Sequence, residues 1–369
     1  MTLQWITSFS NKNIHAPFVI ARDADYYDDL RKRLTFFVKT LKEVSADKES
    51  IEIARKYADR ICDAVVEYYK GRISTCHKKI ENLIRDCNNH ELAVSELSRS
   101  RVFPGVKSSE IQFFRARTLP DAKTLKPKEM LHVPFSQRGK SGNYRFSIPG
   151  VSSLYLANSS YGCWIEMGKP SDHDFYVSPV VLDRKQKIFN LAVMSRLLDE
   201  LNDGDEAYVH CWIKLLVMMI ATSYRIEEEG RSFRSEYIVS QSIMLACKKL
   251  GYDGVAYFSK RTESELLSFA SINVALFAEY ERKADYGSIC RHLKIDEPMN
   301  YQFFRQLDNA ATYQHYPLRV DRTGFPTNIN GFLRQYSYRD TEFHRFDEHL
   351  FGRWEDKDRI RWGNALTEE

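Results

Sequence analysis

The stretch NYRFSIPGVSSLYLANSSYGCWIEMG, residues 143–168, contains a strand-like run that is followed directly by a helical one. SLYLA is the strand candidate and SYGCWIEMG is the helix candidate, with a serine of the preceding SS pair as its N-cap. Arg145, Tyr155 and Glu166 lie in this stretch at spacings of ten and eleven residues. Because a strand-to-helix turn opens a cleft in many α/β proteins, we expect these side chains to line one.

Short strand-like runs alternate with helical runs on both sides of this stretch. The strand candidates are IQFFRARTL, FYVSPVVL, GVAYFS and INVALFAEY, and the further helix candidates are WIKLLVMMIATSYRIEEE and SEYIVSQSIMLACKKLG. The segment RVFPGVKSSE, which precedes them, is rich in Pro, Gly and Ser and is typical of a linker. We therefore predict a compact α+β domain over residues 106–281.

The N-terminal segment, residues 1–105, has helical periodicity instead. In EIARKYADRICDAVVEYY, apolar side chains recur every three or four residues, which indicates one buried stripe of an amphipathic helix. No proline occurs between Pro17 and Pro104, so the pattern predicts helix throughout residues 24–100. These helices would form an all-α bundle, and the bundle offers a surface for homo-oligomer formation.

The C-terminal segment, residues 282–369, is rich in Arg, Tyr, Phe and His, as in FHRFDEHLFGRWEDKDRIRW. Two interpretations stay open for it: helices that pack on the α+β domain, or a surface that stacks on the bases of single-stranded nucleic acid and neutralises its phosphates. The short motif SDHDF, residues 171–175, has no further ligand at a usable spacing, so we expect a polar loop and no metal site.

The composition is that of a soluble globular protein, with 43% hydrophobic and 28% charged residues. The net charge of +4 suits an anionic small molecule but is too small to imply nucleic acid. Seven scattered cysteines without a C-x-x-C pair argue against disulfides and zinc and favour a reducing compartment. The longest apolar run, WIKLLVMMIA, is far shorter than the roughly 20 residues that span a bilayer. We expect a cytoplasmic protein without membrane contact.

Several separated motifs resemble the RES domain, a family named for its arginine, glutamate and serine. Arg115 in FFRAR is followed by Arg145 with SIPG, then by LYLA and Glu166, in the order and spacing of that family. The stretch EYIVSQSIMLACKKLGYDGVAYFSKR is similar to the closing half of the longer RES proteins. The resemblance covers about residues 112–281 and is to the long form, in which a helical (HEPN-like) domain comes first.

The resemblance implies an ADP-ribosyltransferase-like fold in a bacterial toxin that breaks the nicotinamide–ribose bond of NAD. Family members do this by hydrolysis or phosphorolysis, and some transfer ADP-ribose to a macromolecule. NAD would be a substrate, with inorganic phosphate as co-substrate in the phosphorolytic case, and no tightly bound cofactor is expected. The resemblance also implies a toxin–antitoxin or phage-defence system, with an antitoxin or regulatory protein as partner.

Four residues receive roles from the resemblance, and their chemistry fits those roles. Glu166 would stabilise the positive charge that develops on the ribose, and Tyr155 would lie against the nicotinamide. Arg115 and Arg145 would hold phosphates, because a guanidinium fork binds two oxygens at once. We assign Glu166, Tyr155 and Arg115 to catalysis and Arg145 to NAD binding.

The family's serine has more than one candidate position. Ser240 lies next to Gln241 near the start of a predicted helix, and Ser259 lies in YFSKR after a predicted strand. Gln241 itself would occupy the serine position in this subgroup. We assign Ser240, Gln241 and Ser259 to NAD binding.

Two alternatives use the chain differently. The first keeps the same site but transfers ADP-ribose onto a protein or nucleic acid. The second is an RNA-binding or RNA-cleaving protein that acts through the helical bundle. There, RISTCH (residues 72–77) and RDCNNH (residues 85–90) have the arginine–histidine spacing of the HEPN ribonucleases.

Overall fold

The computed structural model describes most of the chain and divides it into two compact units. The first unit contains Met1–Val102, Tyr144–Ile148 and Lys187–Leu266; the second contains Phe103–Asn143, Pro149–Gln186 and Leu267–Glu369. The described residues are 16–20, 24–87, 90, 92–96, 111–120, 125–182, 186–192, 206–227, 230–262, 271–310, 326–327, 336–338 and 341–355. Each unit is therefore assembled from separate stretches, and the domain boundaries at 105 and 281 stay predictions.

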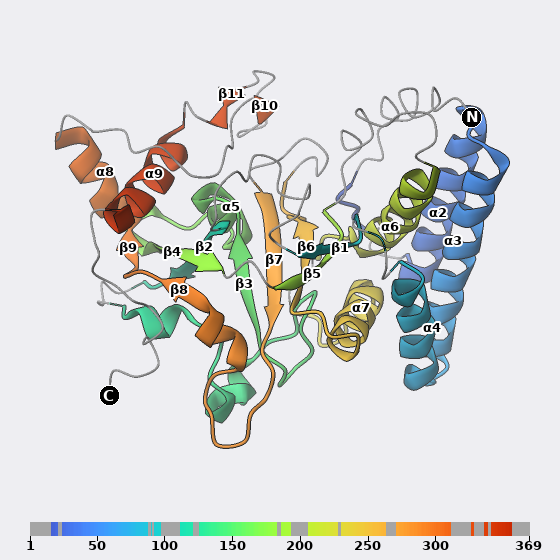
Figure 1. The fold of residues 1–369 in the computed structure, drawn as a ribbon, viewed down its shortest axis with the longest axis horizontal. Coiled ribbons are helices and arrows are strands. Elements are labelled where there is room, and N and C mark those ends of the chain that lie inside the picture. Colours follow the sequence, from blue (N-terminus) through green and yellow to red (C-terminus); the bar gives the residue numbers. More distant parts are fainter. Residues whose placement is uncertain are drawn as a thin grey trace. The chain divides into compact units, whose positions relative to one another are not determined.

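Helices dominate the first unit (Figure 1). They are α2 (Tyr26–Glu43), α3 (Lys48–Tyr69), α4 (Ile73–Arg85), α6 (Glu206–Thr222) and α7 (Ile238–Lys249). Helix α3 packs against the other four helices. Helix α6, which contains the apolar run WIKLLVMMIA, is buried along most of its length because it lies inside this bundle. Nowhere in the described part of the chain is a helix both long and apolar enough to cross a bilayer.

The prediction of helix throughout residues 24–100 was wrong in detail. The helical structure is interrupted between α2 and α3, where Asp47 accepts the Ser50 backbone N–H and caps α3. It breaks again at Gly71, whose φ of 76° is a left-handed conformation that suits glycine. After α4, residues Val94–Glu96 form strand β1 instead of helix, because they pair antiparallel with β5 (Lys187–Asn190). Strand β5 in turn pairs parallel with β6 (Gly254–Phe258).

The second unit is built on a sheet of antiparallel pairs. Its strands are β2 (Ile111–Thr118), β3 (Ser153–Ala157), β4 (Phe175–Leu182), β7 (Ile272–Phe277), β8 (Leu293–Ile295) and β9 (Met299–Asn300). The order is β7-β3-β2-β4-β8, with β9 also on β4. A separate pair joins β10 (Pro326–Thr327) to β11 (Tyr336–Ser337). The predicted α+β class, with helices early in the chain and a mixed sheet after them, is confirmed.

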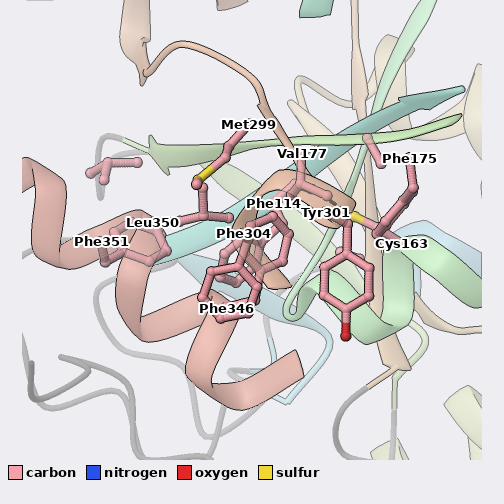
Figure 2. Packing of buried hydrophobic residues seen from close by; sticks show 13 residues of the cluster. Phe114, Cys163, Phe175, Val177, Met299, Tyr301, Phe304, Phe346, Leu350 and Phe351 are labelled. Atoms are coloured by element: carbon pink, nitrogen blue, oxygen red, sulfur yellow. Dashed lines mark hydrogen bonds between the residues drawn. The ribbon is translucent and has the colours of Figure 1, made fainter. Parts of the chain in front are cut away.

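Among the residues that the structure describes, three α-helices accompany this sheet: α5 (Ser160–Glu166), α8 (Tyr301–Ala310) and α9 (Glu342–Glu355). One apolar cluster joins all three helices to the strands, as Figure 2 shows. The strands contribute Phe114 and Val177, α5 contributes Cys163, and α8 and α9 contribute Phe304 and Phe346. The described helices of the C-terminal segment therefore pack on the sheet, as the first of its two interpretations predicted.

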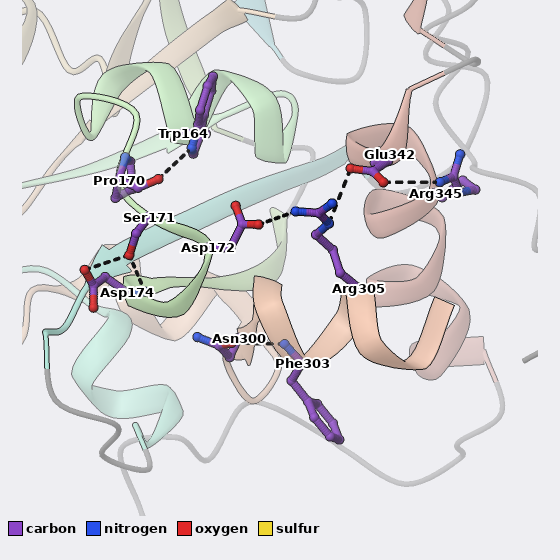
Figure 3. A network of polar contacts seen from close by, with 10 residues as sticks. All are labelled: Trp164, Pro170, Ser171, Asp172, Asp174, Asn300, Phe303, Arg305, Glu342 and Arg345. Atoms are coloured by element: carbon purple, nitrogen blue, oxygen red, sulfur yellow. Dashed lines mark hydrogen bonds and ion pairs between the residues drawn. The ribbon is translucent and has the colours of Figure 1, made fainter. Parts of the chain in front are cut away.

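Charged side chains also join α8 to α9 and to the SDHDF turn (Figure 3). Arg305 of α8 contacts Asp172 in the SDHDF turn, and its Nε lies 3.5 Å from a Glu342 carboxylate oxygen on α9. Arg345 of α9 donates to Asp308 of α8 at 3.0 Å. Within the described residues, no group of three or more His, Cys, Asp or Glu side chains is placed to hold a metal ion.

All seven cysteines are buried and unpaired in thiol form. Five of them belong to the first unit: Cys62, Cys76, Cys87, Cys211 and Cys247. Cys163 and Cys290 belong to the second. The structure thus contains no disulfide among the residues that it describes.

A charge cluster on Glu81 links α4 to α7 and gives the first unit a testable pH dependence. Lys249 of α7 donates to the Glu81 carboxylate at 2.8 Å, and Arg85 and Lys78 of α4 donate at 2.7 and 3.2 Å. The bond from Lys249, followed by that from Arg85, lowers the pKa of Glu81 from 4.5 to about 2. A carboxyl whose pKa is lower in the folded state stabilises the fold above its unfolded pKa and loses this contribution as the pH falls.

We expect Glu81→Gln to lower the melting temperature at pH 7, because the amide cannot carry the charge that three cations surround. The difference from the wild type should shrink as the pH falls from about 4.5 towards about 2. Thermal melting followed by circular dichroism at pH 7, 4 and 3 measures it. Glu43→Gln is the control, because Glu43 is exposed and its ion pair is with the exposed Lys39, at 3.6 Å. An equal Glu81→Gln difference at pH 7 and pH 3 would contradict the assignment.

Candidate functional site

Glu166 is the last residue of α5, the short helix that follows β3 directly. The helix begins where predicted: Ser159 is the N-cap, and its hydroxyl accepts the Gly162 N–H at 2.9 Å. The half-buried Glu166 side chain accepts a hydrogen bond through Oε1 from Nδ2 of Asn273 at 2.6 Å. Asn273 lies on β7, so this bond joins the end of α5 to the sheet.

Asn273 was missed by the sequence analysis. Its side chain is 2% exposed. Because a carboxylate accepts hydrogen bonds, the NH₂ group of the Asn273 amide must be the end that faces Glu166. The amide oxygen, Oδ1, then remains as an acceptor, and no donor among the described residues reaches it. The signal in the sequence was one amide inside the apolar run INVALF.

Tyr155 lies on the same face of the sheet as Asn273. In the β3–β7 register, Ala157 is opposite Asn273 and Tyr155 is opposite Ala275. Residues that face each other across antiparallel strands project to one side, so Tyr155 and Asn273 are diagonal neighbours, about 7 to 8 Å apart at their backbones. The structure therefore brings Tyr155 onto the face where Glu166 is held.

The Arg115 side chain projects from the opposite face of the sheet. It follows Phe114, whose partner across β2 and β3 is Ala157, and successive side chains of a strand alternate between faces. Its guanidinium donates from Nε to Met130 O at 3.0 Å and from Nη1 to Tyr155 O at 3.1 Å. Phe114–Ala157 is the one register pair between β2 and β3, and Arg115 reaches the β3 backbone just beyond it. Arg115 thus contacts the main chain of Tyr155.

Cys163 is buried in the interior of this region. Its thiol donates to Phe114 O at 3.4 Å, and burial raises the pKa of Cys163. Arg115 opposes this rise, while the negative charges of Asp347 and Glu166 add to it. A buried thiol with a raised pKa stays protonated, packs in the core and is no nucleophile.

Arg145 belongs to the first unit and has structural partners there. It is 8% exposed, and its Nη1 donates to Thr222 O at 2.5 Å while Nη2 donates to Tyr224 O. The guanidinium carbon also lies 5.2 Å from the centre of the Tyr237 ring. The carbonyls at the end of α6 thus occupy both terminal nitrogens.

Gln241, Ser240 and Ser259 also belong to the first unit. The Gln241 NH₂ group donates to Tyr144 O and to Ser147 O, each at 3.1 Å, and so holds the turn that presents Arg145. Ser240 is fully buried, and its hydroxyl has no partner among the described residues. The Ser259 hydroxyl is also buried and accepts the Arg261 N–H at 3.2 Å.

The arginine–histidine pair of RDCNNH has local partners. Arg85 donates to Glu81, and His90 accepts the Leu92 N–H at 3.2 Å while its ring lies 5.3 Å from that of Tyr208.

Of the seven predicted site residues, the structure places Tyr155 and Glu166 on one sheet face and Arg115 behind them, all in the second unit. Arg145, Ser240, Gln241 and Ser259 gather in the first unit. Their functional roles stay predictions.

Comparison with known proteins agrees with the resemblance found in the sequence. The family model of the RES domain matches residues 113–296. A protein of Bacillus subtilis (strain 168) named "Putative toxin YopC" is 25% identical over 284 residues, which are 71% of this chain. The chain spans 62% of the length of that relative.

A solved structure is also similar, the M. tuberculosis MbcT–MbcA toxin–antitoxin complex. The match has 13% sequence identity and a TM-score of 0.28, and it covers 54% of this chain and 90% of that chain. The match to the RES domain family, over residues 113–296, includes most of β2 and all of β3, α5 and β7.

Proposed function

We propose that this chain is a RES-type toxin that cleaves the nicotinamide–ribose bond of NAD, by hydrolysis or by phosphorolysis. One observation carries the proposal: a carboxylate, Glu166, is fixed by the buried amide of Asn273 on the sheet face that also bears Tyr155. The name of the Bacillus subtilis relative supports the toxin role. An enzyme that consumes NAD in its own cell needs restraint, so an antitoxin or other regulatory partner belongs to the proposal.

The reaction breaks the bond between ribose C1′ and the pyridinium nitrogen. The nitrogen takes the bonding electrons and nicotinamide leaves as a neutral molecule, so positive charge develops on the ribose. Water or a phosphate oxygen then forms the new bond to C1′, and the proton of water passes to the solvent. A carboxylate held in place before the reaction stabilises that charge without reorganisation, which is the role proposed for Glu166.

Asn273 gives this carboxylate its orientation and adds a second acceptor. Its NH₂ group restrains Oε1 of Glu166, and its own Oδ1 is a buried acceptor without a donor among the described residues. The two hydroxyls of the nicotinamide ribose are donors of the kind that such a pair of acceptors would bind. Tyr155 offers a flat apolar face for the nicotinamide ring. Phosphate binding by Arg115 stays part of the proposal, and the role of Arg145, which belongs to the first unit, stays a prediction.

Purified protein should release nicotinamide from NAD, and Glu166→Gln should reduce the rate by about a hundredfold or more, because the neutral amide cannot balance the developing charge. Chromatography with mass detection, with and without inorganic phosphate, identifies ADP-ribose or its 1-phosphate as the second product. Glu297→Gln, an exposed carboxyl outside the site, is the control. A Glu166→Gln enzyme with unchanged turnover would remove the carboxylate from the mechanism. Label from adenylate-labelled NAD that stays on a macromolecule would assign the site to a transferase.

Asn273→Leu should lower kcat by about tenfold to a hundredfold, the usual value of a hydrogen bond to a charged group. Leucine has the branched shape and the number of side-chain heavy atoms of asparagine, so the fold should survive, but the carboxylate loses the donor that orients it. Steady-state kinetics of nicotinamide release measure kcat and KM separately. Wild-type kcat in this variant, with an unchanged melting temperature, would mean that the Glu166–Asn273 bond has no part in turnover.

A further inference from the structure

Helix α5 cannot hold its own position. It has seven residues, and helices this short are unstable without tertiary contacts. Glu166 is its last residue, so the place of the carboxylate depends on what fixes the rest of the helix. The Asn273 bond holds the end of α5, and the contact at its beginning comes from a distant part of the chain.

Asp347 of α9 supplies that contact. Its side chain is fully buried, its Oδ1 accepts the Ser160 N–H at 3.0 Å, and its Oδ2 accepts the Tyr338 hydroxyl at 2.7 Å. A buried carboxylate is costly unless donors satisfy it, and a negative charge is favourable at the start of a helix. The Ser160 hydroxyl adds a second bond from α5 to the α9 backbone, to Phe343 O at 3.3 Å.

Apolar contacts fix the same orientation. The Phe343 ring lies 5.4 Å from the ring of Tyr161 and 5.4 Å from that of Trp164, both on α5. Cys163 lies in the cluster of Figure 2, which also contains Phe346 and against which Trp164 and Phe343 pack. Helix α5 is therefore enclosed by strand β2 and helix α9, both of which contact it.

We propose that Asp347 is a positioning residue, which holds α5 so that Glu166 meets Asn273. Tyr338, Phe343 and Asp347 all follow residue 296, where the family match ends. The RES domain of this chain is thus completed by a C-terminal segment from outside the family boundaries. The catalytic part of this inference rests on the proposed function, but the contact between α9 and α5 does not.

Four variants separate the effect of the bond between Ser160 N–H and Asp347 from the effects of the neighbouring contacts. Asp347→Ala removes both accepting oxygens, and Asp347→Asn keeps the shape and an accepting oxygen for Ser160. Ser160→Pro removes the N–H that Asp347 accepts. Proline is favoured at the first position of a helix, and Ser159 already has the extended conformation (φ −153°, ψ 155°) that a following proline requires. Ser160→Ala removes only the hydroxyl.

We expect Asp347→Ala and Ser160→Pro to lower kcat for nicotinamide release by about tenfold to a hundredfold with little change in KM. The double variant Asp347→Ala/Ser160→Pro should be no slower than Asp347→Ala/Ser160→Ala, because proline removes only an N–H that has already lost its acceptor. Asp347→Asn should restore most of the activity. Asp308→Asn removes a carboxylate of α8 that pairs with Arg345 of α9, the helix that bears Asp347, and should match the wild type.

Amide hydrogen exchange read by mass spectrometry tests the contact without any substrate. Asp347→Ala should speed exchange in the peptide that contains α5 while β2, β4 and β7 stay protected, and Asp347→Asn should restore the protection. Unchanged α5 exchange in Asp347→Ala, or loss of protection throughout the sheet with a parallel loss of activity, would overturn the proposal. If the wild type releases no nicotinamide, the proposed function fails, and the exchange result still decides whether Asp347 positions α5.

Discussion

The bond between Glu166 and Asn273 is the interaction on which the candidate site depends. It spans 107 residues of sequence and joins the end of a seven-residue helix to a buried strand. A helix with one or two turns gains little from its own backbone bonds, so its side chains point where tertiary contacts direct them. In this protein two such contacts act at opposite ends of α5, one from β7 and one from α9. The geometry of the carboxylate is therefore a property of the whole second unit.

The register of the sheet decides which groups can act together. Because side chains of a strand alternate, the single pairing of Phe114 with Ala157 assigns Arg115 to the face opposite Tyr155. A shift by one residue would exchange these faces and bury the wrong set of side chains. The cluster around Phe304 and Phe346 makes such a shift costly, since it fills the face that β2 and β3 present to α5, α8 and α9.

The sequence predicted local structure well and distant partners poorly. The strand SLYLA, the helix after it and a serine N-cap follow from period and capping chemistry, and all three are present. Asn273 and Asp347 could not be predicted as partners of α5, because they lie 107 and 187 residues from the groups they bind. The sequence also did not show that Arg145 donates to two backbone carbonyls, because the donors of a guanidinium fit carbonyl oxygens as well as phosphate oxygens. Its role in NAD binding stays a prediction.

The seven buried thiols divide between the two units, five in the first and two in the second. Each can meet an alkylating reagent only when its surroundings open, so the rate of modification reports local unfolding. Mass spectrometry that assigns the modified peptides would give separate opening rates for the helical unit and for the unit with Glu166. The native chain therefore carries its own set of reporters, with no need for an introduced label.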